Sequence, residues 1–405
     1  MPLSRANLLK AFDRKKVVEI ASQTARIKSY SGDEAEIAEW TADFMSDLGL
    51  EVSLKEVAPR RFNVIGIWRG RGRGPSLMYN GHMDTNPAGE GWTRAPLGGE
   101  TDDNFVYGIG ICNMKAGNAS FLHATAMLKS TGFEPEGQVI LAFVHGELQG
   151  GVGTVNLIES GIRADYFIVG EPTELTLLTR HSASFVFQIT VLGKTRHLSK
   201  REDGIDAVVG LEKLLPRLRA LSFTGAASDE DGQLNRINIG VIRCGVSREL
   251  FDWRPQQLAD VCVVKCAGRF APSQNLDQAM RDIQTLIDEI EREDPTFKAE
   301  LKMVEENRIF MPSFHVEHEA PPVVALRNAH QAVTGQTPKV GMHTPARFFG
   351  SDAAHLAKVG MVGVLYGPGG QFNTMPDERV AIAEMETASK VYAATVLDIA
   401  GSIRT

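Results

Sequence analysis

Cysteine is scarce in this 405-residue chain, which contains only Cys112, Cys244, Cys262 and Cys266. Four cysteines in so long a chain make no disulfide framework, and no two of them have the CxxC spacing of a metal knuckle. Cys262 and Cys266 fall on one face of a predicted strand, where packing in a core is the expected role. Such sparse cysteine is typical of proteins of the reducing cytoplasm, so a cytoplasmic localisation is expected.

Basic charge and long apolar runs are also missing. The chain has 43 Lys and Arg residues against 50 Asp and Glu residues, a formal net charge of −7. Without a basic segment we expect no nucleic-acid partner. No stretch approaches the about 18 apolar residues of a membrane span, and the first residues, MPLSRANLLKAFDRKK, lack the apolar core of a signal peptide. The composition, 43% hydrophobic and 23% charged, is instead that of globular domains.

Strand and helix patterns alternate over the first 180 residues. The apolar spacing predicts helices over 4–25, 33–48, 116–130 and 152–160, and strands over 63–68, 76–79, 138–144 and 166–169. Strands that alternate with helices usually pair in parallel. This part of the sequence therefore predicts an α/β sheet between helices.

The pattern changes after Arg180. The following elements are predicted to be a strand over 185–192, a helix over 204–221, strands over 235–243 and 260–267, a helix over 276–293 and a strand over 297–303. This β-α-β-β-α-β order is the split βαβ arrangement of a small two-layer α+β domain. The helix–strand alternation resumes after Pro321, with helices over 321–334, 351–359 and 384–400 and a strand over 363–366.

Two domains follow from this change of pattern. We predict a larger α/β domain made of residues 1–180 and 313–405, with a mixed, mostly parallel sheet. Residues 181–312 are then a second domain inserted into it.

Polar residues follow the predicted strands of the larger domain. The segments are GHMDT at 81–85, HGE at 145–147, GEPT at 170–173 and GPGG at 367–370, and YGIGICNMKAG at 107–117 leads into a helix. Because the carboxyl ends of parallel strands meet at one edge of a sheet, these residues should converge in one cleft. One such residue is usually only a cap, but several together indicate an active site.

Seven motifs in this order resemble those of the co-catalytic zinc exopeptidases and deacylases, the family of acetylornithine deacetylase, succinyl-diaminopimelate desuccinylase, aminoacylase and carboxypeptidase G. They are GHMDT, GIGICNMKAG, GELQGGVGT, VGEPT, LGKTRHLSKREDGIDAV, GSDAAHL and the final GPGG…NTMPDE, spread over residues 15–400. The resemblance implies a catalytic α/β domain with two metal ions and an inserted domain that forms a lid. It also implies a small-molecule substrate and a homodimer through residues 181–312.

Part of the family's site is kept. By resemblance, His82 and Glu171 match ligands of the first ion, and Asp84 matches the aspartate that orients the histidine. Glu147 falls on the general base. A carboxylate buried at a strand end would have a raised pKa, which suits proton transfer near neutral pH.

Three other ligand positions have changed. The bridging aspartate is Asn113, the second glutamate of a Glu-Glu pair is Leu148, and the late histidine is Thr374. Two dications carry four positive charges, and Glu171 is the one anionic ligand left to offset them, so we expect no dinuclear centre. A single Zn²⁺ or Mn²⁺ on His82 and Glu171, with Asn113 or a water added, and a metal-free pocket both stay open. Catalytic zinc usually takes three protein ligands.

The lid motif is also kept in part. By resemblance, His197 matches a histidine that crosses the dimer and donates to the substrate carbonyl or its oxyanion, and Arg269 matches an arginine that binds a substrate carboxylate. Arg201 replaces the family's proline, and Ala267 replaces an aspartate, which suggests a reshaped lid. The family's Asn-x-x-Pro contact is only approximated by residues 252–255, DWRP.

Four further residues are expected to line the pocket. Asn113 and Thr374 would touch substrate or water through polar side chains. Gly369, in GPGG, would expose a backbone N–H to an anionic substrate end. His145 would either contact the substrate from behind the ligands or act as a replacement ligand, a role also open to Asp352.

These residues predict a hydrolase that cleaves a C–N, amide-like bond in a small carboxylate-bearing substrate such as an N-acyl amino acid. Glu147 would be the general acid/base, with His82, Asp84 and His197 as the other catalytic residues. The same groups would also serve a metal-independent lyase, cyclase or isomerase, and a non-catalytic binding protein on a retired peptidase scaffold stays open. Retention of Glu147 favours an enzyme, because a binding protein has no use for a buried general base.

Overall fold

A computed structural model describes residues 3–252, 255–306 and 308–401 of the chain. Its internal contacts divide it into two units. Unit 1 comprises Met1–Arg180, Phe314–Arg347 and Ser351–Thr405, and unit 2 comprises His181–Ser313 and Phe348–Gly350. The first division falls between residues 180 and 181 and the second within one residue of the predicted boundary, with a short return of the chain to unit 2 at 348–350.

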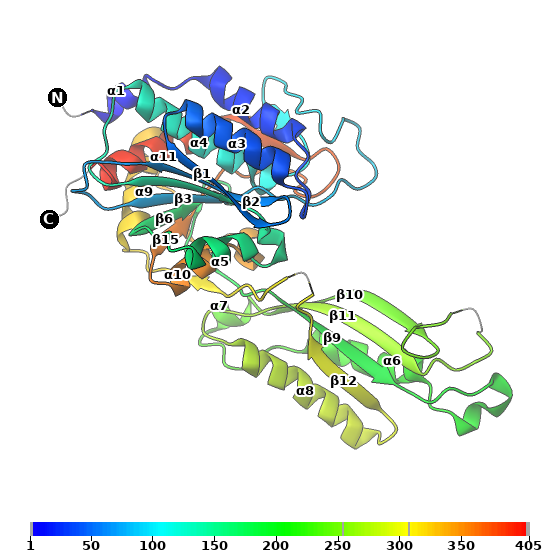
Figure 1. Cartoon of the computed structure of the whole chain (residues 1–405). Helices are drawn as coiled ribbons and strands as arrows, with labels where there is room; N and C mark the ends of the chain where they lie inside the picture. The colour runs from blue at the N-terminus through cyan, green and yellow to red at the C-terminus, as the bar shows by residue number, and fades with distance from the viewer. Residues whose placement is uncertain (1–2, 253–254, 307, 402–405) are drawn as a thin grey trace. The chain divides into compact units, whose positions relative to one another are not determined.

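Among the described residues, unit 1 is built on an eight-stranded sheet of order β1-β2-β5-β3-β6-β15-β7-β14 (Figure 1). The strands are β1 Glu51–Ala58, β2 Arg61–Trp68, β3 Leu77–His82, β5 Val139–Val144, β6 Tyr166–Val169, β7 Leu177–Leu178, β14 Val340–Gly341 and β15 Val362–Leu365. The central neighbours β5, β3, β6 and β15 are parallel, whereas β1 and β2 are antiparallel to their partners. The predicted mixed, mostly parallel α/β sheet is confirmed.

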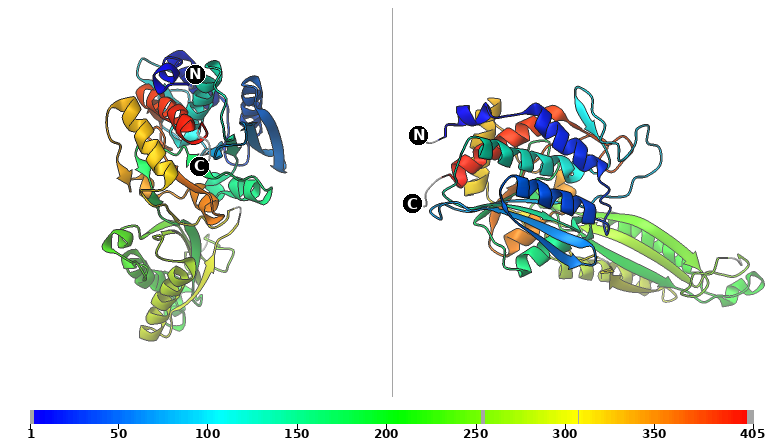
Figure 2. Two further views of the ribbon diagram at one scale, coloured as in Figure 1. Left: turned by 90° about the vertical axis from the view of Figure 1, so that its left-hand side faces the viewer. Right: turned by 45° about the horizontal axis from the view of Figure 1, so that its top comes forward.

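Helices cover both faces of this sheet (Figures 1 and 2). On one side lie α2 Arg14–Arg26, α3 Ala35–Asp47, α4 Ala116–Ser130 and α11 Ile382–Ile399, and on the other lie α5 Val152–Glu159 and α10 Ala353–Lys358. Helix α9, Pro321–Thr334, packs against α11, and the short strands β4 Phe105–Tyr107 and β16 Arg379–Ala381 pair with each other. Over the described residues, no helix is both long enough and apolar enough to cross a membrane.

At the amino-terminal end one prediction was wrong and one strand was missed. The helix expected over 4–25 is divided into α1 Arg5–Leu9 and α2, because the Asp13 carboxylate caps a new helix by accepting the N–H groups of Lys15 and Lys16. Strand β1 was not predicted at all. It is an edge strand in which no side chain is buried, and its short polar–apolar alternation ends at Glu56.

Unit 2 has the predicted β-α-β-β-α-β order. Its main elements are β9 Phe185–Leu192, α6 Ala207–Ala220, β10 Arg236–Gly245, β11 Val261–Arg269, α8 Leu276–Glu293 and β12 Lys298–Met303. The strands form an antiparallel sheet of order β10-β11-β9-β12. Apolar residues of β9, β11, α6 and α8 make one buried cluster, so the two helices cover one face of the sheet.

Two of the four cysteines form a single disulfide, which the sequence did not predict. Cys244 and Cys262 are joined, with their Cα atoms 4.1 Å apart on directly opposed positions of β10 and β11. The pairing depends on the register of two strands, which cysteine counting does not show. Cys112 and Cys266 are free and buried. Because disulfides are uncommon in the cytoplasm, cytoplasmic localisation stays a prediction.

Candidate active site

The central parallel strands of unit 1 bring three predicted site residues together at their carboxyl ends. His82 is the last residue of β3, while Glu147 follows β5 and Glu171 follows β6. Strand β3 pairs with both β5 and β6, so the three strand ends are adjacent. The exposed fractions of His82, Glu147 and Glu171 are 1%, 8% and 2%, so the cluster is buried.

Both ring nitrogens of His82 face oxygen atoms. Nδ1 lies 2.9 Å from the backbone carbonyl oxygen of Asp84 and 3.6 Å from its carboxylate. Nε2 lies 3.0 Å from Asn113 Oδ1 and 3.8 Å from Glu171 Oε1. A neutral imidazole has one N–H, so only the doubly protonated ring donates to oxygens on both sides. The hydrogen bond of the predicted His82–Asp84 pair is thus made by the Asp84 carbonyl rather than by its carboxylate.

The Asp84 carboxylate holds the turn that carries Glu147. Its Oδ1 accepts the backbone N–H of Glu147 at 3.0 Å, and its Oδ2 accepts that of Leu148 at 3.2 Å. The Ser31 hydroxyl donates to Oδ2 at 2.9 Å. Asp84 therefore orients His82 through its main chain and Glu147 through its side chain.

Four buried carboxylates influence the protonation of His82. Burial alone would lower the pKa of His82, but Glu171, Asp84, Glu147 and Asp352 raise it to about 9. Burial raises the pKa of Glu147 well above its usual value, although the charge of His82 opposes this shift. Burial likewise raises the pKa of Asp352 to about 7. The surrounding carboxylates therefore favour the charged form of His82, and burial favours the protonated form of Glu147.

Leu148 and Thr374 occupy the two positions that would supply ligands to the second ion alone. Neither is a buried charged group like those of the cluster around His82. Leu148 is a half-buried alkyl side chain without a donor atom. Thr374 is exposed, has a φ of 61°, and donates its N–H to Glu378 at 3.1 Å. Within the described part of the chain, no group of three or more His, Cys, Asp or Glu side chains has a metal-binding arrangement. Neither Leu148 nor Thr374 thus offers a charged donor at its position, and the number of bound ions stays a prediction.

Glu378 is a residue of the site region that the sequence reasoning missed. Its carboxylate accepts backbone N–H groups of Gly110 at 3.1 Å, Cys112 at 2.7 Å and Thr374 at 3.1 Å. It thereby ties the GIGICNMKAG segment to the final NTMPDE motif, in which it is the last residue.

Burial raises the pKa of the Cys112 thiol well above its usual value, so this cysteine is unsuited to be a nucleophile.

Two predicted pocket residues are engaged by other parts of the chain. His145 Nδ1 lies 3.0 Å from Asn63 Oδ1, and burial together with the charge of Arg61 lowers the pKa of His145 to about 4. The Gly369 N–H donates to the Glu384 carboxylate at 2.5 Å. An anionic substrate end would have to displace Glu384 to use this amide.

His197 and Arg269 belong to unit 2. His197 is exposed, and its Nδ1 lies 2.9 Å from the Ser199 hydroxyl. Arg269 ends β11 and donates from Nε to the Phe348 carbonyl and from Nη1 to the Gly268 carbonyl, both at 3.0 Å. The roles of both residues toward a substrate stay predictions.

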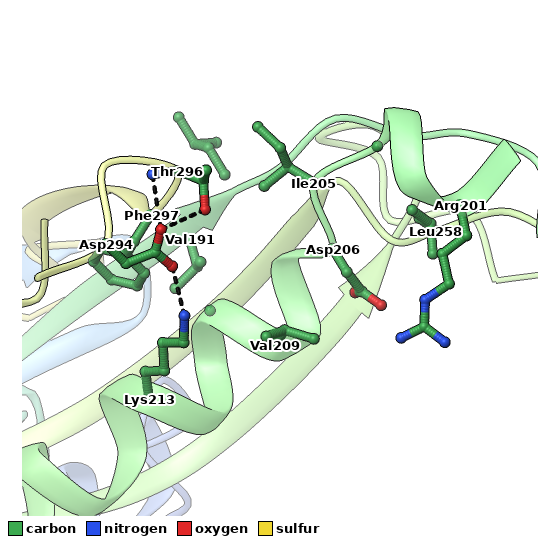
Figure 3. Close-up of a pocket in the computed structure, with 13 residues that line it drawn as sticks. Val191, Arg201, Ile205, Asp206, Val209, Lys213, Leu258, Asp294, Thr296 and Phe297 are labelled. Atoms are coloured by element: carbon green, nitrogen blue, oxygen red, sulfur yellow. Dashed lines mark hydrogen bonds and ion pairs between the residues drawn. The ribbon is translucent and has the colours of Figure 1, made fainter.

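Arg201 lines a hollow of unit 2 of about 240 Å³ (Figure 3). The hollow lies beside the start of α6, where Asp206 caps the helix, and Lys213 forms an ion pair with Asp294 at 2.5 Å within it. The two carboxylates and the lysine of the hollow thus already make contacts within unit 2.

Of the predicted contact at 252–255, residues 253 and 254 lie outside the described residues.

Residues 78–398 match the protein family described as Peptidase family M20/M25/M40. One curated relative is the N-formyl-4-amino-5-aminomethyl-2-methylpyrimidine deformylase of Bacillus subtilis, 25% identical over 381 residues that cover 88% of this chain and 87% of the relative. Another is the acetylornithine deacetylase of Myxococcus xanthus, 26% identical over 349 residues that cover 84% and 83%. These relatives support an enzyme that hydrolyses amide bonds of small molecules.

Solved structures share the fold. A tripeptidase from Staphylococcus aureus superposes with a TM-score of 0.79 at 19% identity, covering 96% of this chain and 99% of that one. A dinuclear metal-binding M20 peptidase from Bacillus subtilis has a TM-score of 0.67 at 16% identity, covering 96% and 99%. The family match spans most of the chain and agrees with the seven motifs. The chain therefore belongs to the M20/M25/M40 family of peptidases.

Proposed function

We propose that this enzyme hydrolyses the C–N bond of a small carboxylate-bearing amide, such as an N-acyl amino acid, without a two-metal centre and with Glu147 as general acid/base. The asymmetry of the site carries the proposal. A buried carboxylate lies beside His82 and Glu171, whereas Leu148 and Thr374 occupy the positions where a second ion needs ligands. The names of the relatives, a deformylase and a deacetylase, support removal of a small acyl group.

The residues fit at most one divalent ion, Zn²⁺ or Mn²⁺. His82 Nε2, Glu171 Oε1 and Asn113 Oδ1 would hold it, and the Asp84 carbonyl already orients the other nitrogen of His82 as metal-bound histidines require. A bound ion would act as a Lewis acid on the substrate carbonyl. Without an ion, the imidazolium of His82 places positive charge at the same position.

Glu147 moves the protons of the reaction in this proposal. It accepts a proton from a water molecule as the water oxygen attacks the acyl carbon. It then delivers that proton to the nitrogen as the C–N bond breaks, so that a carboxylic acid and an amine leave. Burial raises the pKa of Glu147, which makes its carboxylate a stronger base and its acid form stable enough to serve as the donor.

The lid would supply the remaining contacts. His197 of the partner subunit would donate to the substrate carbonyl or its oxyanion, and Arg269 would bind the substrate carboxylate. Asn113 and Thr374 would touch the substrate from unit 1. A protein donor aimed at the developing oxyanion typically contributes about 10²–10³ in kcat.

We also propose a homodimer through residues 181–312. Strand β10 is an edge of the unit 2 sheet, and its Val241 and Ile242 are 39% and 45% exposed. An edge strand that exposes apolar side chains is suited to pair with a second copy. Light scattering after size-exclusion chromatography should give twice the chain mass, and a Val241→Lys, Ile242→Lys variant should give the monomer.

The function is tested with purified enzyme and a panel of N-formyl, N-acetyl and N-succinyl amino acids. We expect Glu147→Gln to lower kcat by about 10²–10⁴. The matched control is Glu159→Gln, an exposed glutamate at the end of α5, which should leave kcat unchanged. Metal content and activity after chelation are measured on the same preparations.

Four outcomes would contradict the proposal. Full activity of Glu147→Gln would show that Glu147 is not the general base. Activity that needs two ions per chain would show that the enzyme uses the family's two-metal centre. Turnover that releases no acid and amine pair would favour a lyase, cyclase or isomerase. Tight binding without turnover by either form would favour a binding protein.

A further inference from the structure

The turn that carries Glu147 has little intrinsic rigidity. It is the single 3-10 turn Glu147–Gln149, flanked by Gly146, Gly150 and Gly151 with φ values of 69°, 89° and 84°. Three glycines in the left-handed region within six residues leave the unfolded backbone unusually free. The turn has backbone hydrogen bonds of its own, and contacts from elsewhere add to them in fixing the position of the Glu147 carboxylate.

A buried ion pair supplies one of these contacts. The Glu34 side chain is 0% exposed and that of Arg61 is 14% exposed. Arg61 donates from Nε and Nη2 to the two Glu34 oxygens, at 2.9 and 2.5 Å, and from Nη1 to Gln149 Oε1 at 2.5 Å. A Cβ added at Gly146 would lie 3.1 Å from Arg61 Nη2, so the guanidinium also packs on the start of the turn.

The segment before α3 braces the same turn from a second direction. The Gly32 N–H donates to Glu34 Oε1 at 2.9 Å, and the Ser31 hydroxyl donates to Asp84 Oδ2. Asp84 in turn accepts the backbone N–H of Glu147. Residues 31–34 therefore connect both groups that hold the turn, the Asp84 carboxylate and the Arg61 guanidinium.

We infer that Glu34, Arg61 and Gln149 are positioning residues that hold the turn and so set the rate of proton transfer by Glu147. The inference rests on the proposed hydrolysis. Arg61 acts through geometry, because its two-bond pair with Glu34 fixes the plane of the guanidinium beside the turn. A general base must stay within hydrogen-bond reach of its water, and a displacement of about 1 Å can lower the rate about 100-fold.

Gln149→Ala tests the inference most directly, because it removes the Nη1 acceptor and leaves the Glu34–Arg61 pair in place. We expect kcat to fall about tenfold with KM within about twofold of wild type and no change in melting temperature. Arg61→Gln should lower kcat about 100-fold, and Arg61→Lys should restore part of it, because lysine keeps the charge without the fork. An unchanged kcat in Gln149→Ala would overturn the inference.

A double variant separates positioning from independent damage. Gln149→Ala combined with Arg61→Gln should be no slower than Arg61→Gln alone, because both changes break the same contact. Two effects that multiply in full would show independent causes and overturn the inference. The control Arg217→Gln breaks an exposed two-bond pair with Glu293 in unit 2 and should leave kcat unchanged.

Hydrogen exchange gives a readout that needs no substrate. In Gln149→Ala we expect faster exchange of the amides of residues 145–153 and unchanged exchange in β9. If exchange at the turn becomes faster but the wild-type protein shows no turnover, the positioning role is supported and the proposed function is contradicted. Unchanged exchange at the turn would overturn the inference even in an active enzyme.

Discussion

Two histidines at the ends of neighbouring parallel strands have opposite electrostatic surroundings. His82 ends β3 and His145 follows β5, and their exposed fractions are only 1% and 2%. Nearby carboxylates raise the pKa of His82 to about 9 against the effect of burial, whereas burial and the charge of Arg61 lower the pKa of His145 to about 4. Burial lowers the pKa of both histidines, but the carboxylates around His82 override this effect, whereas the charge of Arg61 adds to it at His145.

Each of the two histidines also has a ring nitrogen 3.0 Å from an asparagine oxygen. On the His82 side, Nε2 faces the oxygens of Asn113 and Glu171, which belong to the site. On the other side, Asn63 Oδ1 accepts the backbone N–H of His145 at 3.3 Å and lies 3.0 Å from its ring Nδ1. The contacts of His82 thus include a second carboxylate residue, Glu171, whereas those of His145 come from Asn63, and the role of His82 toward a substrate stays a prediction.

Restoring a two-metal centre should remove the contrast between the ends of β3 and β5. Of the changes proposed here, it should have the largest effect on metal content and activity. A variant with Asn113→Asp, Leu148→Glu and Thr374→His regains the ligand types that the family resemblance assigns. We expect two Zn²⁺ per chain instead of at most one, and activity that chelation removes, because the added carboxylates offset the second dication. Elemental analysis of the dialysed protein measures the ions.

A matched variant tests the charge argument. It carries Leu148→Gln in place of Leu148→Glu, has nearly the same bulk and lacks the anion, so we expect at most one ion. If the variant with Leu148→Glu also binds only one ion, the loss of ligands does not explain why the site lacks a second ion.

A smaller change should shift the pKa of only one of the two histidines. Glu171→Gln removes a negative charge 3.8 Å from His82 Nε2. We expect the pKa of His82 to fall from about 9 toward its usual value by about one unit, while that of His145 stays near 4. The imidazolium is then lost at lower pH, so the alkaline limb of the activity profile moves to lower pH as well. Nitrogen-15 NMR of the imidazole rings measures both pKa values, and parallel shifts would contradict the contrast.

Much of the fold could be predicted because several elements carry strong local patterns. The strand Phe185–Leu192 and the helices Leu276–Glu293 and Pro321–Thr334 have the predicted bounds, since each buries one regularly spaced apolar face. Strand β1 lacks such a face because it is an exposed edge. The division between α1 and α2 depends on one capping carboxylate inside a continuous apolar pattern.

The site could be predicted only where it follows strand ends. His82 ends a buried strand, and Glu147 and Glu171 come within three residues of the ends of two others, so sequence order places the three side chains near one another. Glu34 and Arg61 gave no signal, because their pairing depends on how the start of α3 meets the start of β2. The contact between Cys244 and Cys262 likewise depends on strand register, which no local pattern encodes.

The smallest expected effect concerns stability in acid. The pKa of His145 is about 4 in the fold against 6.5 for the free side chain, so the unfolded chain binds the proton more readily between these values. The stabilisation is complete above pH 6.5 and is lost as pH falls to 4, by at most about 3 kcal/mol of unfolding free energy. For His82 the sign is opposite: its contribution is complete below pH 6.5 and is lost as pH rises through about 9.

His145→Gln should therefore flatten the fall of unfolding free energy between pH 6.5 and 4 and leave the alkaline loss unchanged. Urea unfolding over this range measures the slope. His123→Phe is the matched control, because burial also lowers the pKa of His123 to about 4, in α4 and away from the strand ends. Both variants should lose part of the acid slope. A change confined to the alkaline side in His145→Gln would mean that the two strand ends do not differ in the sign of their charge environment.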